Sequence, residues 1–244
     1  MSEENEISGL WDLPECCTSY IISFTSPKDA CIASAVSMGF KSAAESDTVW
    51  EGFLPPDYQD IIARSVSPVL YSSKKELYFH LCDSPLLLDD GKLSFRLSKP
   101  SGKKCYMLCA RELNIIWGDT PMYWNWRTLT ESRFAEHISC SKSFRNSYGL
   151  ESRSKASVKL VQQSISDVEG GNNTVYLERP THVQDIDGRM PEERRDMWME
   201  IELGEYFNDE GDEGDIQMQL LETEILGWKR GLIIEGIELR PKEG

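Results

Sequence analysis

The sequence has few of the residues that usually build metal sites and disulfide frameworks. Its 244 residues include only three histidines, and none of them stands at the spacing of zinc ligands. Seven cysteines are present, an odd number, and no Cys-x-x-Cys pair occurs among them. We therefore expect free, mostly buried thiols in a reducing compartment, and no metal or other cofactor.

Long apolar runs and an excess of positive charge are also missing. No apolar stretch approaches the ~20 residues that a membrane helix needs, and the acidic residues 1–6 are the opposite of a basic signal-peptide start. The formal net charge of −15, from 41 acidic and 26 basic residues, repels nucleic acid and anionic membranes on average. We expect a protein of the cytoplasm and nucleus, with neither nucleic acid nor a membrane as partner.

The pattern along the chain changes from helical to strand-like. We expect an acidic tail at 1–12, compact helices at 13–56, a helical connector with a first strand at 57–100, and a β-sandwich at 101–244. Ser26, Ser46 and Ser73 are placed as helix caps, and Leu93 to Leu97 alternates as a strand does. The predicted class is α+β, with a small helical region before antiparallel sheets.

The helical region has an apolar face that it cannot bury alone. The face is formed by side chains at helical spacing, namely Leu13, Cys17, Tyr20, Ile21 and Phe24. About 40 residues is near the lower limit for a self-sufficient domain. The pattern therefore predicts a partner surface.

The order of motifs in this region resembles the F-box. The matching positions are Leu13-Pro14, Ile21-Ile22, Ser26-Pro27-Lys28-Asp29, Val36-Ser37 and Val49-Trp50. Residues 41–50 are similar to the version found on plant phloem lectins. The resemblance implies docking on the Skp-type adaptor of a cullin–RING ubiquitin ligase, through Leu13, Pro14, Ile21, Ile22, Val36 and Trp50. The alternative is that these side chains pack only within the chain.

The densest aromatic run of the sequence lies at 113–126. Residues 113–117 predict a short strand, and residues 118–121 predict a turn. Indole rings such as Trp117 and Trp124 beside a strand end suit stacking on sugar rings, although tryptophan more often fills a core. Both interpretations stay open on the residues alone.

Several ordered blocks resemble the plant phloem-lectin family, the phloem protein 2-like or Nictaba-type lectins. They are residues 106–119, 123–126, 198–207 and 228–241. The resemblance implies a lectin-like, jelly-roll sandwich that binds N-acetylglucosamine oligomers and N-glycans through Trp117, Trp124, Asp215 and Glu222. Asp215 departs from the glutamate usual in the family.

One segment departs from that family pattern. Residues 137–155 are polar and lack sustained alternation, so we expect about two strands of the sandwich to be missing there. A sheet shortened in this way exposes its edges. The predicted consequence is a less stable lectin half that binds glycan weakly or not at all.

These features predict a non-catalytic, substrate-recognition subunit of a ubiquitin ligase, whose lectin half binds glycans or glycoproteins. One rival is a sandwich that binds an unglycosylated protein surface. A second rival is a glycan-processing enzyme that uses Glu200, Glu202 or Glu222, because glycosidases need two nearby carboxylates. The acidic run at 208–215 does not fit an EF-hand calcium loop and predicts a solvated turn.

Overall fold

The computed structural model describes residues 13–140, 155–162, 173–177, 188–194, 196–205, 216–221 and 232–242. The chain divides into two compact units. The first contains Met1–Thr120, Asn125–Ile138 and Ile233–Gly244, and the second contains Pro121–Trp124 and Ser139–Leu232. The predicted tail at 1–12 lies outside the described residues.

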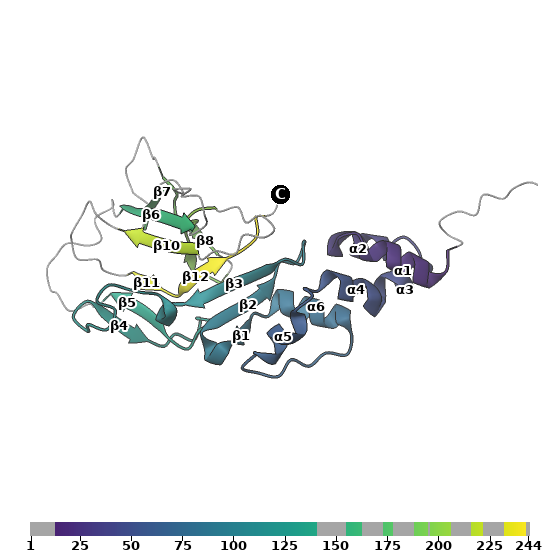
Figure 1. Cartoon of the computed structure of the whole chain (residues 1–244), viewed down its shortest axis with the longest axis horizontal. Helices are drawn as coiled ribbons and strands as arrows, with labels where there is room; N and C mark the ends of the chain where they lie inside the picture. The colour runs from purple at the N-terminus through teal and green to yellow at the C-terminus, as the bar shows by residue number, and fades with distance from the viewer. Residues whose placement is uncertain are drawn as a thin grey trace, which may run out of the picture. The chain divides into compact units, whose positions relative to one another are not determined.

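Four short helices form the N-terminal part of the first unit (Figure 1), namely α1 (Glu15–Ser23), α2 (Pro27–Ala33), α3 (Met38–Glu45) and α4 (Asp47–Phe53). The Ser26 hydroxyl accepts a hydrogen bond from the backbone N–H of Asp29 at 3.1 Å. The Ser46 hydroxyl accepts one from Thr48 at 3.3 Å. Both predicted caps are therefore confirmed, and each satisfies an N–H that the helix itself cannot pair.

Two further helices and a four-stranded sheet complete this unit. The elements are α5 (Tyr58–Ala63), α6 (Lys74–Asp83), β1 (Leu86–Leu88), β2 (Leu93–Leu97), β3 (Lys104–Cys109) and β12 (Gly236–Leu239). The sheet order is β1-β2-β3-β12, and each neighbouring pair is antiparallel. The Ser73 hydroxyl caps α6 by accepting from Glu76 at 3.1 Å, as the sequence predicts.

One hydrophobic core runs from the helices into this sheet. Trp50 of α4, Tyr78 of α6 and Phe95 of β2 are all completely or almost completely buried in it. The ring centroids of Trp50 and Tyr78 lie 5.2 Å apart. At the surface, Lys104 of β3 forms an ion pair of 2.9 Å with Asp57, just before α5. The helices and the sheet therefore share one core across the predicted boundaries at residues 56 and 100.

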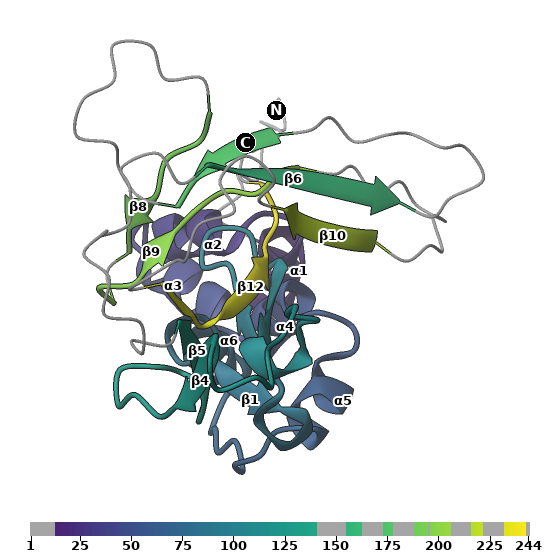
Figure 2. The same ribbon diagram turned by 90° about the vertical axis from the view of Figure 1, so that its left-hand side faces the viewer.

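Three smaller sheets occur among the other described residues. One has the order β11-β5-β4, with β4 (Trp124–Arg127), β5 (His137–Cys140) and β11 (Ile233–Ile234). In Figure 2, β6 (Lys155–Gln162) lies between β10 (Ile216–Leu221) and β7 (Asn173–Tyr176), and β8 (Glu192–Glu193) pairs with β9 (Met199–Glu200). Every strand pair with a described register is antiparallel. The predicted α+β class, with helices before antiparallel sheets, is confirmed.

Two stretches differ from the elements predicted for them. Residues 113–117 form no strand: Leu113 lies in a bend, Asn114 and Ile115 are irregular, and Ile116 and Trp117 belong to a turn in which Trp117 has a left-handed φ of 59°. Residues 137–140, predicted to lack a strand, form β5, in which all four residues are buried. A strand that is buried on both faces need not alternate between apolar and polar residues, so the sequence pattern did not reveal β5. Residues 141–154 lie outside the described residues.

Candidate functional site

Helix α1 exposes several large apolar side chains, while its buried side consists of Thr18, Ser19 and Ile22. The apolar face, called here the α1 face, consists of Leu13 (38% exposed), Tyr20 (60%), Ile21 (47%) and Phe24 (72%). On the opposite side, Thr18 and Ser19 are buried, and the Ser19 hydroxyl donates to the carbonyl of Ala43 at 3.1 Å. A surface helix normally has the reverse arrangement. An apolar face left uncovered in this way indicates a binding partner.

The aromatic side chains of the α1 face are held in a defined arrangement. Tyr20 and Phe24 contact each other edge to face, with ring centroids 4.7 Å apart. An open hollow lies beside them, lined by Leu13, Glu15, Cys16, Cys17, Ser19, Tyr20, Ile21, Ser46 and Thr48. The Glu15 carboxylate accepts a hydrogen bond from the Ser42 hydroxyl at 2.9 Å. The hollow therefore combines apolar side chains with polar groups from α1 and α4.

The six residues expected to contact an adaptor occupy two kinds of position. Leu13, Pro14, Ile21 and Val36 are exposed, whereas Ile22 and Trp50 are 4% and 1% exposed and belong to the core. The indole N–H of Trp50 donates to the carbonyl of Ala44 at 2.7 Å. Ile22 and Trp50 thus support α1 and α4 from beneath, and only the other four can meet a partner without rearrangement.

Two exposed apolar residues near this region were missed by sequence reasoning. Ile32 of α2 is 57% exposed, and Met38 at the start of α3 is 80% exposed. Their apolar character was visible in the sequence, but exposure depends on which helix faces pack together. They extend the uncovered apolar surface beyond α1.

The residues expected to bind carbohydrate are only partly described. Trp117 is 65% exposed at the tip of a turn in which its carbonyl accepts from the N–H of Thr120 at 2.9 Å. Trp117 is therefore a surface residue and not part of a core. Trp124 is the first residue of β4 and is half-buried. Trp117 belongs to the first unit and Trp124 to the second, while Asp215 and Glu222 lie outside the described residues.

An arginine stacked on a tryptophan lies in the first unit and was not predicted. The Arg111 guanidinium carbon is 3.7 Å from the centroid of the Trp126 ring, and the Arg111 Nε donates to Glu136 at 2.9 Å. The hydrogen bond from Arg111 lowers the pKa of the Glu136 carboxyl. The three residues are far apart in sequence, so no spacing rule could have grouped them.

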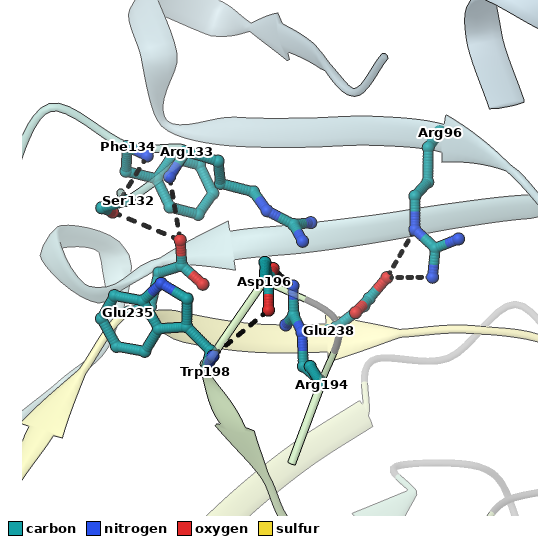
Figure 3. A network of polar contacts seen from close by, with 9 residues as sticks. All are labelled: Arg96, Ser132, Arg133, Phe134, Arg194, Asp196, Trp198, Glu235 and Glu238. Atoms are coloured by element: carbon teal, nitrogen blue, oxygen red, sulfur yellow. Dashed lines mark hydrogen bonds and ion pairs between the residues drawn. The ribbon is translucent and has the colours of Figure 1, made fainter. Parts of the chain in front are cut away.

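A buried carboxylate near the C-terminal strands anchors a loop. Glu235 is 6% exposed, and its Oε1 accepts from the backbone N–H of Arg133 at 2.9 Å and from the Ser132 hydroxyl at 3.2 Å (Figure 3). These bonds place Phe134, which is 3% exposed, against Met107 and Cys109. The geometry gives Glu235 a structural role in holding the loop before β5.

Of the three carboxylates considered for glycosidase chemistry, Glu200 and Glu202 are among the described residues and Glu222 is not. Glu202 forms an ion pair of 3.1 Å with Arg189 and has a side chain that is 55% exposed. In the described part of the chain, no cluster of three metal-binding side chains occurs, and no helix has the length and apolar character to cross a membrane.

Comparison with known proteins agrees with the two resemblances seen in the sequence. Residues 10–52 match the F-box domain family, and residues 103–143 and 138–241 match the family Phloem protein 2. "F-box protein PP2-B10" of Arabidopsis thaliana is 44% identical over 265 residues, covering 98% of this chain and 96% of the relative. "F-box protein SKIP3" of the same plant is 40% identical over 265 residues, covering 96% and 89%. The chain therefore belongs to the plant F-box proteins that carry a phloem protein 2 domain.

Proposed function

We propose that this chain is a substrate-recognition subunit of a cullin–RING ubiquitin ligase and binds a Skp-type adaptor through the α1 face. The observation that carries the proposal is the inverted burial of α1, with Ile21 and Phe24 exposed while Ser19 is buried. Membership of the F-box proteins supports the same partner. In this account the chain performs no chemistry and acts in the cytoplasm and nucleus.

The chemistry of the α1 face fits a protein groove. Branched aliphatic and aromatic side chains contribute about 1.5–3 kcal/mol each when they move from water into an apolar site. Tyr20 and Phe24 already contact each other, so little rotamer freedom is lost when they are covered. Such preorganised anchors usually contribute most of an interface's binding energy.

The shared core explains how target binding and adaptor binding can be coupled. The sheet β1-β2-β3-β12 packs on the same core as Trp50 and Tyr78, so the start of the phloem protein 2 domain is fixed to the F-box helices. A target held by that domain then stays near the ligase at high effective concentration. Transfer of ubiquitin becomes an event within one complex.

For the target, we propose glycans or glycoproteins that carry N-acetylglucosamine oligomers or N-glycans. The exposed indole of Trp117 supports this, because a flat apolar ring at the surface can stack on the C–H face of a sugar. On the resemblance to the family, we also propose Trp124, Asp215 and Glu222 as glycan contacts. The alternative target is an unglycosylated protein surface, which the same exposed ring can also contact.

Capture from a plant extract tests both halves of the proposal. The wild-type chain should co-purify adaptor and cullin, whereas Ile21→Asp should lose both. Val66→Asp is a matched control, because Val66 is 56% exposed but follows α5. N-glycosidase treatment should release captured targets from wild type but leave the adaptor bound. Targets that stay bound after the treatment would favour a protein surface.

A further inference from the structure

The exposed cysteines of this chain are concentrated in the F-box helices. Cys16 and Cys17, adjacent in α1, are both exposed and both line the hollow beside the α1 face. Cys105, Cys109 and Cys140 are buried. Three exposed thiols differ from the expectation of mostly buried ones. Two of them lie on the surface proposed to bind the adaptor.

Resting on the proposed function, we propose that Cys16 and Cys17 form a thiol-modification site where a mixed disulfide with glutathione blocks adaptor docking. The hollow they line also contains Leu13, Tyr20 and Ile21, so an adduct on either sulfur covers the anchors directly. Glutathione is a tripeptide with two carboxylates. It therefore places both bulk and charge where an apolar contact is needed.

The modification is a thiol–disulfide exchange with oxidised glutathione as the oxidant. The thiolate of Cys16 or Cys17 attacks one sulfur of oxidised glutathione, the glutathione S–S bond breaks, and a bond between the Sγ of that cysteine and the attacked sulfur forms. The second glutathione leaves as a thiolate, takes up the proton that the cysteine released, and is the reduced product. The reverse exchange with reduced glutathione restores the free thiol.

The two neighbouring thiols interact with each other. The hydrogen bond between Cys17 and Cys16 and the charge repulsion from Cys16 raise the pKa of the Cys17 thiol. Both thiols are exposed and line the hollow, so either one can carry the adduct. Exchange with an external thiol removes the adduct and restores the free cysteine.

A thiol that is less accessible than Cys16 and Cys17 provides a contrast. Cys82 of α6 is half-buried, and burial raises its pKa to about 11. A thiol that is both covered and protonated exchanges slowly. The exposed thiols on the F-box helices are thus the first to react, and Cys31 of α2 provides a control because it is exposed but does not line the hollow.

The test uses the full chain treated with oxidised glutathione, peptide mass mapping of the adduct, and direct measurement of binding to a purified Skp-type adaptor. We expect the adduct on Cys16 or Cys17 to weaken adaptor binding by at least about 10-fold, and reduction to restore it. Cys16→Ser/Cys17→Ser should bind the adaptor equally well with and without the treatment. Cys31→Ser should remain as sensitive as wild type.

Two results overturn the inference. One is a chain modified at Cys16 or Cys17 that binds the adaptor as tightly as the reduced chain. The other is that neither Cys16 nor Cys17 forms the adduct. Failure of the proposed function looks different, because the reduced, untreated chain would then not bind the adaptor. Binding is reciprocal, so bound adaptor should also protect both thiols from the exchange.

Discussion

Gly236 on β12 lies so close to the carbonyl oxygen of Leu108 on β3 that a methyl group on Gly236 would stand 2.1 Å from that oxygen. Gly236 is paired with Cys109 in the antiparallel register of the two strands. Because the obstacle is backbone and not a flexible side chain, the methyl group cannot be accommodated without moving a strand. The absence of a side chain at this position therefore lets the C-terminal strand join the sheet.

Gly236→Ala should destabilise the protein by about 2 kcal/mol or more, since overpacking against backbone costs roughly 1–3 kcal/mol. Chemical denaturation of the purified chain measures the change. Gly39→Ala in α3 is the control, because its nearest neighbouring atom would be 3.9 Å away and alanine favours a helix. That variant should be as stable as wild type or slightly more so. Equal stability of Gly236→Ala and wild type would show that β12 is not held by this close approach.

Trp50→Phe tests whether Trp50 only supports the F-box helices from within the core or also contacts the adaptor. The change removes the hydrogen bond to the Ala44 carbonyl and some core volume, so we expect a loss of about 2 kcal/mol in stability. Adaptor affinity, measured well below the melting temperature, should stay close to wild type because Trp50 is 1% exposed. A folded Trp50→Phe variant with much weaker adaptor binding would show that Trp50 touches the partner.

The buried His137 makes stability depend on pH. Burial lowers the pKa of His137 from its usual 6.5, and the charge of Arg127 acts in the same direction, while Glu235 opposes both. The unfolded chain therefore binds this proton more readily, and stability present above pH 6.5 is lost as the pH falls below it. His137→Gln should show a smaller loss of unfolding free energy between about pH 7.5 and about pH 5.5 than wild type. An identical loss in His137→Gln and wild type would contradict the assignment.

Glycan affinity tests the segment that departs from the family pattern. We still expect weaker binding of N-acetylglucosamine oligomers than in a complete family member, because residues 137–155 depart from the family pattern. Residues 137–140 form β5, and residues 141–154 lie outside the described residues. Trp117→Ala should abolish whatever binding remains without changing the melting temperature, since Trp117 is exposed. Calorimetric titration measures the affinity, and family-like affinity in the wild type would show that the segment completes the site.

Local rules predicted much of the helical half. Ser26, Ser46 and Ser73 cap helices because a serine hydroxyl satisfies an N–H only two or three residues away. Asp57 shows the limit of such rules. It stands at the start of α5, but its carboxylate forms an ion pair with Lys104, 47 residues away, and makes no side-chain cap. The sequence pattern could not reveal that partner.

Long-range packing decided the features that the sequence did not predict. The sequence predicted that the apolar face of α1 would need a partner surface, but it could not show that Ser19 would be buried and bind the Ala43 carbonyl of another helix. The Glu235 anchor joins residues more than one hundred positions apart, so no motif marks it. The strand predicted at 113–117 does not form, and Trp117 adopts a left-handed backbone conformation there, which tryptophan rarely does.

Direct measurement of the affinity between the purified chain and a Skp-type adaptor tests the proposed function most directly. Leu13→Ala/Pro14→Ala truncates two exposed side chains that lie just before α1, so the fold of the double variant should be the same as that of wild type. Truncating an interface anchor commonly costs about 2 kcal/mol, so we expect affinity to fall about 30-fold or more, with an unchanged melting temperature. Undiminished adaptor binding by this folded double variant would contradict docking through the α1 face.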